Sequence, residues 1–171
     1  MQFLGYTLIW DWCRQNGYAL DEGIGMVAPR LASDPSLIDG ERIVHAAAGN
    51  LEASLALASK CLETLGNWDS CLLWVTEWDV WESIEDWPRY YAWRALFDEK
   101  RSLSAAPGHV FRSDEQLEIL WLFSHALECG WDVVILPVRH ERPTGIRLRS
   151  SHDEWIQFTA DQLVTLPATA V

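Results

Sequence analysis

The sequence predicts an α+β domain in which N-terminal helices, one of them long and amphipathic, pack on a small, mainly antiparallel sheet. Three observations predict this class. Apolar residues at helical spacing run from Val44 to Leu65, and a short β-branched and aromatic run covers residues 70–77. Two alternating segments, 145–150 and 155–159, flank a turn and predict a C-terminal β-hairpin.

Length and composition indicate one folded domain. The chain has 171 residues, of which 49% are hydrophobic and 22% charged, so it can bury a core without a disulfide or a metal. We expect a single domain over residues 1–160 and a loose tail over residues 161–171.

The helices are predicted from periodicity and end signals. A short helix over residues 4–16 ends at Asn16-Gly17. The long amphipathic helix is predicted from Asp39 to Gly66-Asn67, and Gly49-Asn50 inside it leaves open a division into two helices. Its apolar stripe has a repeating 4-3 spacing and consists of Val44, Ala48, Leu51, Leu55, Ala58, Leu62 and Leu65.

The second half of the chain alternates between the two kinds of element. Pro88 predicts the start of a helix over 88–101, because proline is favoured at the first helical position. The box Ser113-Asp114-Glu115-Gln116 predicts a helix that begins there and ends at Cys129. The apolar run 132–138 predicts a buried strand.

Charge and cysteine usage restrict the partners and the compartment. Thirteen Lys and Arg against 25 Asp and Glu give a net charge of −12, which argues against binding to nucleic acid or an anionic membrane. No segment approaches the roughly 18 apolar residues of a membrane span. Four scattered cysteines and an N-terminus unlike a signal peptide predict a cytoplasmic protein with reduced thiols.

Charge is also unevenly distributed along the chain. Seven acidic residues and no Lys or Arg lie between Cys61 and Trp87, whereas four arginines lie from Arg139 to Arg149. One interpretation is a solvated acidic face that pairs with those arginines. The other is an acidic surface that docks a basic protein, in which Glu77, Asp79 and Glu82 contact the partner.

The densest group of chemically active side chains lies in the segment 77–87. Trp78 and Trp81 predict either core packing or a flat platform for a ligand, and Glu85 is a candidate acid or base. Arg94 predicts either a surface ion pair with Asp98 or, if it faces inward, a clamp for Glu85 or a ligand carboxylate.

The histidines offer further candidates for acid–base chemistry. His109 follows the Pro107-Gly108 turn and is either a loop base or a packing residue. His152-Asp153 lies at the hairpin turn, where Asp is common for backbone reasons but an imidazole beside a carboxylate is also half of an acid–base site. His125 is expected to be solvated. No cofactor or metal site is predicted, since no nucleotide-binding, hydrolase or metal-ligand spacing is present.

Several short motifs between Trp74 and Phe158 resemble a family of small uncharacterised bacterial proteins. They are Thr76-Glu77-Trp78, Trp81-x-Ser83-x-Glu85-x-Trp87, Tyr91, Arg94, Ala106-Pro107-Gly108-His109-x-Phe111, Gly130-Trp131-Asp132 and Ser151-His152-Asp153-Glu154. The resemblance implies a shared fold and a location in a bacterial cytoplasm, and it implies no mechanism.

Two functional hypotheses follow. The first is a non-catalytic binding protein that docks a basic partner, as an inhibitor of the immunity-protein type does. The second is a small hydrolase or ligand-binding enzyme with a tryptophan-walled cleft, in which Glu85, Arg94, His109 and His152-Asp153 meet.

Overall fold

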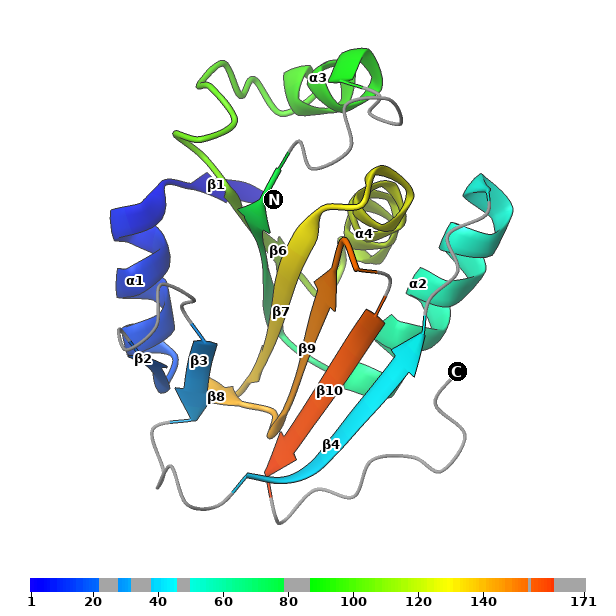
Figure 1. The fold of residues 1–171 in the computed structure, drawn as a ribbon. Coiled ribbons are helices and arrows are strands. Elements are labelled where there is room, and N and C mark those ends of the chain that lie inside the picture. Colours follow the sequence, from blue (N-terminus) through cyan, green and yellow to red (C-terminus); the bar gives the residue numbers. More distant parts are fainter. Residues whose placement is uncertain (22–27, 32–37, 46–49, 79–86, 154, 162–171) are drawn as a thin grey trace.

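A computed structural model describes residues 1–21, 28–31, 38–45, 50–78, 87–153 and 155–161. It has an α+β fold, as the sequence predicts (Figure 1). The helices of this described part are α1 (Tyr6–Gln15), α2 (Leu51–Leu65), α3 (Trp87–Ala95) and α4 (Gln116–Cys129). None of them is long and apolar enough to cross a lipid bilayer.

The main sheet is antiparallel throughout and its central strands come from the second half of the chain. Its order is β1 (Gln2–Leu4), β6 (Gly108–Arg112), β5 (Ser70–Glu77), β7 (Asp132–Arg139), β9 (Ile146–Ser151), β10 (Trp155–Asp161) and β4 (Ile38–His45). The short β8 (Arg142–Pro143) pairs with β7, and β2 (Tyr18–Asp21) forms a separate hairpin with β3 (Ala28–Leu31). Strands β9 and β10 form the predicted C-terminal hairpin.

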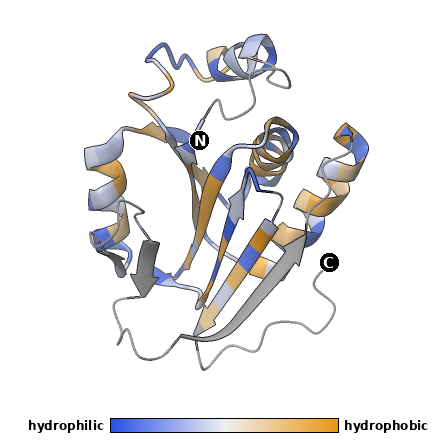
Figure 2. Cartoon of the chain, viewed as in Figure 1, coloured by the Kyte–Doolittle hydropathy of each residue, from blue (hydrophilic) through white to orange (hydrophobic). Residues whose placement is uncertain are grey.

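Helices cover both faces of this sheet (Figure 1). On one face α1 packs over Leu72, Trp74 and the alternate apolar residues of β7. On the other face α2, α3 and α4 bury the larger core, which includes Leu73 and Val75 of the same strand. Strands β5 and β7 are therefore buried on both sides, and Figure 2 shows that hydrophobic residues concentrate on the central strands and on α4.

Close contact fixes α1 against strand β6. A Cβ atom placed on Gly108 would lie only 2.6 Å from Cγ1 of Ile9, a fully buried residue of α1. Glycine at this position lets the helix approach the strand more closely than any side chain allows.

The four cysteines, Cys13, Cys61, Cys71 and Cys129, are buried and form no disulfide bonds. Burial raises the pKa of the Cys13 and Cys61 thiols to about 12 and also raises the pKa of Cys71. The thiols of Cys13, Cys61 and Cys71 are therefore protonated and pack as small apolar groups.

The predicted long helix over 39–65 is wrong in its first half. Residues 38–45 form strand β4, and α2 begins only at Leu51, after the side chain of Asn50 accepts a hydrogen bond from Ala53 N at 2.9 Å. Val44 pairs with Ile156 in β10, so the apolar 4-3 spacing crosses a boundary between two elements. Tertiary pairing with β10 overrides the local helical pattern.

Two helix ends also differ from the prediction. Helix α3 ends at Ala95 rather than at residue 101, because Asp98 adopts a left-handed conformation (φ 54°) and Glu99 N bonds back to Arg94 O at 3.2 Å. The N-cap of α4 is Glu115, whose side chain makes no capping hydrogen bond, so the Ser113 capping box does not form. The Glu115 carboxylate instead accepts from Arg112 N, before the helix, at 2.8 Å.

Candidate functional site

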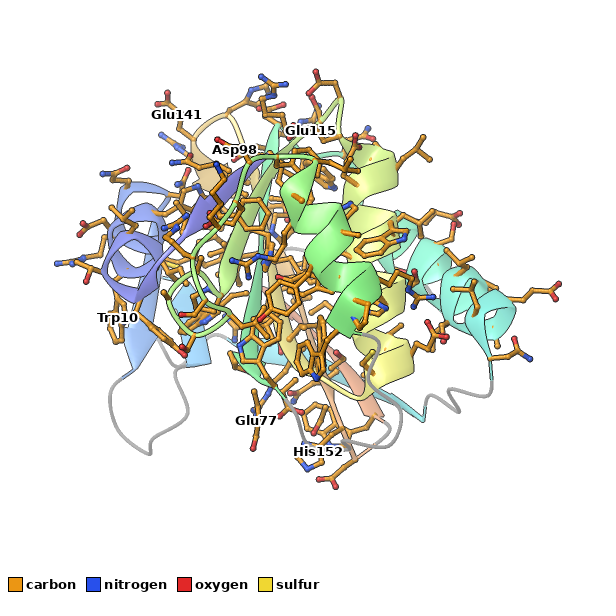
Figure 3. The ribbon with its side chains drawn as sticks, turned by 90° about the horizontal axis from the view of Figure 1, so that it is seen from above. Trp10, Glu77, Asp98, Glu115, Glu141 and His152 are labelled. Carbon is orange, nitrogen blue, oxygen red and sulfur yellow. The ribbon has the colours of Figure 1, made fainter. Side chains whose placement is uncertain are left out.

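Three strand ends bring a histidine and three carboxylates together at one end of the sheet. Glu77 closes β5, Asp132 opens β7, and His152 and Asp153 form the turn between β9 and β10. The register explains the meeting, because Glu77 pairs directly with Asp132 and the next residue of β7 pairs with Ser150. We call Glu77, Asp132, His152 and Asp153 the acidic end. Figure 3 shows Glu77 and His152 side by side on the opposite side of the molecule from Glu115 and Glu141.

Asp132 is the fixed point of the acidic end. Asp132 is only 4% exposed, and its backbone carbonyl accepts a hydrogen bond from the Thr76 hydroxyl at 3.2 Å. Its Oδ1 lies 2.7 Å from His152 N and 2.8 Å from His152 Nδ1, so one carboxylate oxygen holds both the backbone and the ring of the histidine. The other ring nitrogen, Nε2, lies 3.6 Å from Oδ1 of Asp153.

These contacts favour the charged form of the histidine. The hydrogen bond with Asp132 raises the pKa of His152, and the charges of Asp132, Asp153 and Glu77 act in the same direction, while partial burial opposes them. Only the neutral imidazole can accept a proton, so a raised pKa makes His152 a weaker general base at any given pH.

Negative charge nonetheless exceeds positive charge at the acidic end. Three carboxylates face one imidazole, and within the described part of the chain no Lys or Arg forms an ion pair with any of them. Glu77 and Asp153 are exposed, so this excess is presented to solvent.

An aromatic cluster lies behind the acidic end. The Trp78 ring is 4.8 Å from Trp131, and Trp87 stacks on the same ring at 5.5 Å. Tyr90 lies edge-on to Trp131 at 5.2 Å. Trp78 is half-buried in this cluster and supports the core, with its indole Nε1 buried and without an acceptor in the described part of the chain.

A second polar group lies inside the core, under α3. The fully buried His109 places Nε2 at 2.7 Å from the Tyr90 hydroxyl and Nδ1 at 3.3 Å from the Leu73 carbonyl. A carbonyl only accepts, so Nδ1 carries the proton and Nε2 accepts from Tyr90. Burial lowers the pKa of His109 to about 3, and the nearby Arg94 charge adds to this effect. His109 is therefore neutral.

Arg94 belongs to the same interior group. It is fully buried, with Nη2 bonded to the Arg101 carbonyl at 2.7 Å and 3.7 Å from Oε1 of Glu99. The surface ion pair between Arg94 and Asp98 does not form, since Asp98 pairs with Lys100 at 2.7 Å. Arg94 Nε and Nη1 have no hydrogen-bond partner in the described part of the chain.

The candidate residues thus fall into two separate groups. His109 pairs with Leu73, which lies four residues before Glu77, so about 13 Å of strand separates it from the acidic end. The structure does not bring His109 and Arg94 together with His152 and Asp153 in one cleft. The remaining candidates, Asp79, Trp81, Glu82 and Glu85, lie outside the described residues, as does the tail beyond Asp161.

The sequence did not predict the roles of two residues, Asp132 and His125. Asp132 looked like the start of a buried strand, and only the β7–β9 register reveals its pairing with His152. The expected solvated His125 is instead buried, stacked on Trp121 at 5.2 Å and 2.5 Å from Arg89 Nη2. It lies on the apolar side of α4 because that helix is covered over most of its circumference.

Comparison with known proteins finds no match to this chain among family models, curated proteins or solved structures.

Proposed function

We propose that this protein is a non-catalytic binding protein whose acidic end docks a positively charged protein partner. The observation that carries the proposal is the charge imbalance at the acidic end. Three carboxylates meet one imidazole there, and two of the three are exposed on strand and turn positions. An arginine or lysine of a partner is the complement of such a surface.

The rest of the molecule supports docking rather than catalysis. The net charge of −12 attracts a basic partner over a distance and speeds encounter. His109 is neutral, buried and bonded at both ring nitrogens, so it has no free position for a substrate proton. His152 is held by Asp132, and within the described residues its hydrogen bonds and ion pairs reach only carboxylates and no hydroxyl or thiol nucleophile.

The experiment compares two double variants that remove the same charge. Glu77→Gln with Asp153→Asn neutralises the acidic end, and Glu52→Gln with Glu63→Gln neutralises two exposed acids of α2. Binding of a deca-arginine peptide is measured by calorimetry at about 20 mM and 150 mM salt, with EDTA present. We expect at least tenfold weaker binding for the first variant and less than twofold for the second.

The salt series adds a second criterion. Binding to the wild type should weaken as salt rises, because screening shortens the range of the interaction. Equal weakening by both double variants would show that only overall charge matters and would overturn the assignment to the acidic end. Absence of binding by the wild type at low salt would reject docking of a basic partner.

A further inference from the structure

The acidic end contains the donor set of a metal site. One ligand atom each from Glu77, Asp132 and His152 lie within 4.8 Å of one another. We propose that these three residues bind a divalent transition-metal cation of the zinc class. This inference does not rest on the proposed docking function.

The kinds of donor select the kind of metal. An imidazole nitrogen with two carboxylate oxygens suits Zn²⁺ and its neighbours, whereas Mg²⁺ and Ca²⁺ prefer oxygen-only sites. Three protein ligands leave a fourth position of a zinc tetrahedron open to water.

The ligands are held by the fold to different degrees. Asp132 is nearly buried and is fixed by the β5–β7 pairing, while the His152 ring is held against it by two contacts to the same oxygen. Glu77 is exposed and is the ligand that can move. In a zinc tetrahedron ligand atoms lie about 3.4 Å apart, so small side-chain rotations close the present spacing.

A proton and a metal would compete for the same ring nitrogen. His152 Nδ1 lies 2.8 Å from Asp132 Oδ1, and a carboxylate only accepts, so Nδ1 carries the proton and donates it to this hydrogen bond. Coordination through Nδ1 requires its loss to the buffer, so metal and proton compete for the imidazole.

The other end of β7 provides a matched comparison. There Asp69 Oδ2 accepts from His140 N at 2.7 Å and lies 3.5 Å from His140 Nδ1, which repeats the contacts of Asp132 with His152. In the described part of the chain no third ligand completes that pair, whereas Glu77 completes the one at the acidic end.

The test is a calorimetric titration with Zn²⁺ alone of protein that has been treated with EDTA and then desalted. We expect Glu77→Gln and His152→Ala each to weaken zinc binding at least tenfold. His140→Ala and Glu63→Gln, which change the same residue types elsewhere, should leave it within twofold. Circular dichroism identifies any variant that fails to fold. If His152→Ala does not fold, Glu77→Gln still tests the site, because Glu77 is exposed.

Proton release provides an independent measurement. At about pH 6.5, titrations in two buffers of different ionisation enthalpy should report up to one proton released per zinc, and the His152→Ala protein should not release it. Wild-type affinity retained in both Glu77→Gln and His152→Ala, or equal loss in His140→Ala, would overturn the site. The docking experiment contains EDTA and therefore does not depend on zinc. A failure of the zinc proposal would leave the docking proposal standing, and the reverse also holds.

Discussion

The hydroxyl of Tyr90 donates a hydrogen bond to Nε2 of His109 across 2.7 Å, inside a core from which water is excluded. This bond connects α3 to β6 and fixes the tautomer of the histidine. Removing it leaves a buried acceptor without a donor, and that loss costs about 1 to 3 kcal/mol.

Tyr90→Phe should therefore lower the free energy of unfolding by about that amount. Urea denaturation followed by tryptophan fluorescence measures it. Tyr91→Phe is the matched control, because Tyr91 is 48% exposed and its change should cost less than about 0.5 kcal/mol. Equal costs for the two variants would contradict the role given to the buried hydroxyl.

The burial of His109 predicts sensitivity to acid. Its pKa is about 3 in the folded protein and near 6.5 in the unfolded chain, so below pH 6.5 the unfolded state binds the extra proton. Folding stability from this residue should fall by about 2 to 3 kcal/mol between pH 6.5 and pH 4.5. Urea midpoints at these two pH values measure the loss, and His109→Gln should reduce it. An unchanged pH slope in that variant would reject the neutral buried histidine.

His152 predicts the opposite pH dependence. Its pKa is raised in the folded state, so its pairing with Asp132 stabilises the protein fully below about pH 6.5 and is lost as pH rises through the folded value. The difference in stability between wild type and His152→Ala should therefore be larger at pH 5.5 than at pH 8.5. The exposed His140 makes His140→Ala the control, and a difference that grows with pH would contradict the assigned pair.

Neighbouring acids at the end of α3 should respond very differently to neutralisation. The Glu99 side chain is 7% exposed and bonds to Arg101 Nε at 2.9 Å beside the buried Arg94, whereas the Asp98 side chain is 84% exposed. We expect Glu99→Gln to cost about 2 to 4 kcal/mol, since it leaves buried guanidinium charge uncompensated. Asp98→Asn should cost less than about 0.5 kcal/mol. Similar urea midpoints for both variants would disprove the asymmetry.

The contact of Gly108 with Ile9 predicts a coupled effect. Gly108→Ala introduces a methyl group 2.6 Å from Ile9 Cγ1 and should destabilise the protein by about 1 to 3 kcal/mol. Ile9→Ala removes the obstructing atoms, so the double variant should be more stable than the sum of the two single changes predicts. A double-mutant cycle in urea measures the coupling, and strict additivity would show that the helix moves aside without cost.

The parts of the fold that could be read from the sequence have local causes. The strand over 70–77 was predicted with its observed bounds, because an aromatic and β-branched run stands between clear turn signals. The residues of β4 were assigned to a helix because Val44 and Ala48 happen to continue the stripe of α2. The end of α3 carried no signal, since Asp98 takes a conformation usually reserved for glycine.

The candidate site depended on relationships that sequence spacing does not contain. His152 and Glu77 were recognised separately as chemically active residues. Their meeting requires the registers of β5 with β7 and of β7 with β9, which are set by pairing across the whole sheet. Asp132, which joins them, resembled any acidic residue at a strand end. The enzyme hypothesis grouped His109 and Arg94 with His152. In the fold, the length of β5 between Leu73 and Glu77 keeps His109 and Arg94 apart from the acidic end.

The reactivity of the buried cysteines reports local unfolding of this protein. A thiol reacts with an aromatic disulfide reagent only as a thiolate, and Cys13, Cys61 and Cys71 are neither accessible nor ionised while the fold is intact. Because Cys13 is a buried residue of α1 and Cys61 of α2, the labelling rates at the two positions report when the helices on opposite faces of the sheet detach. Equal labelling rates would show that both helical layers open together, and unequal rates would identify the layer that leaves first.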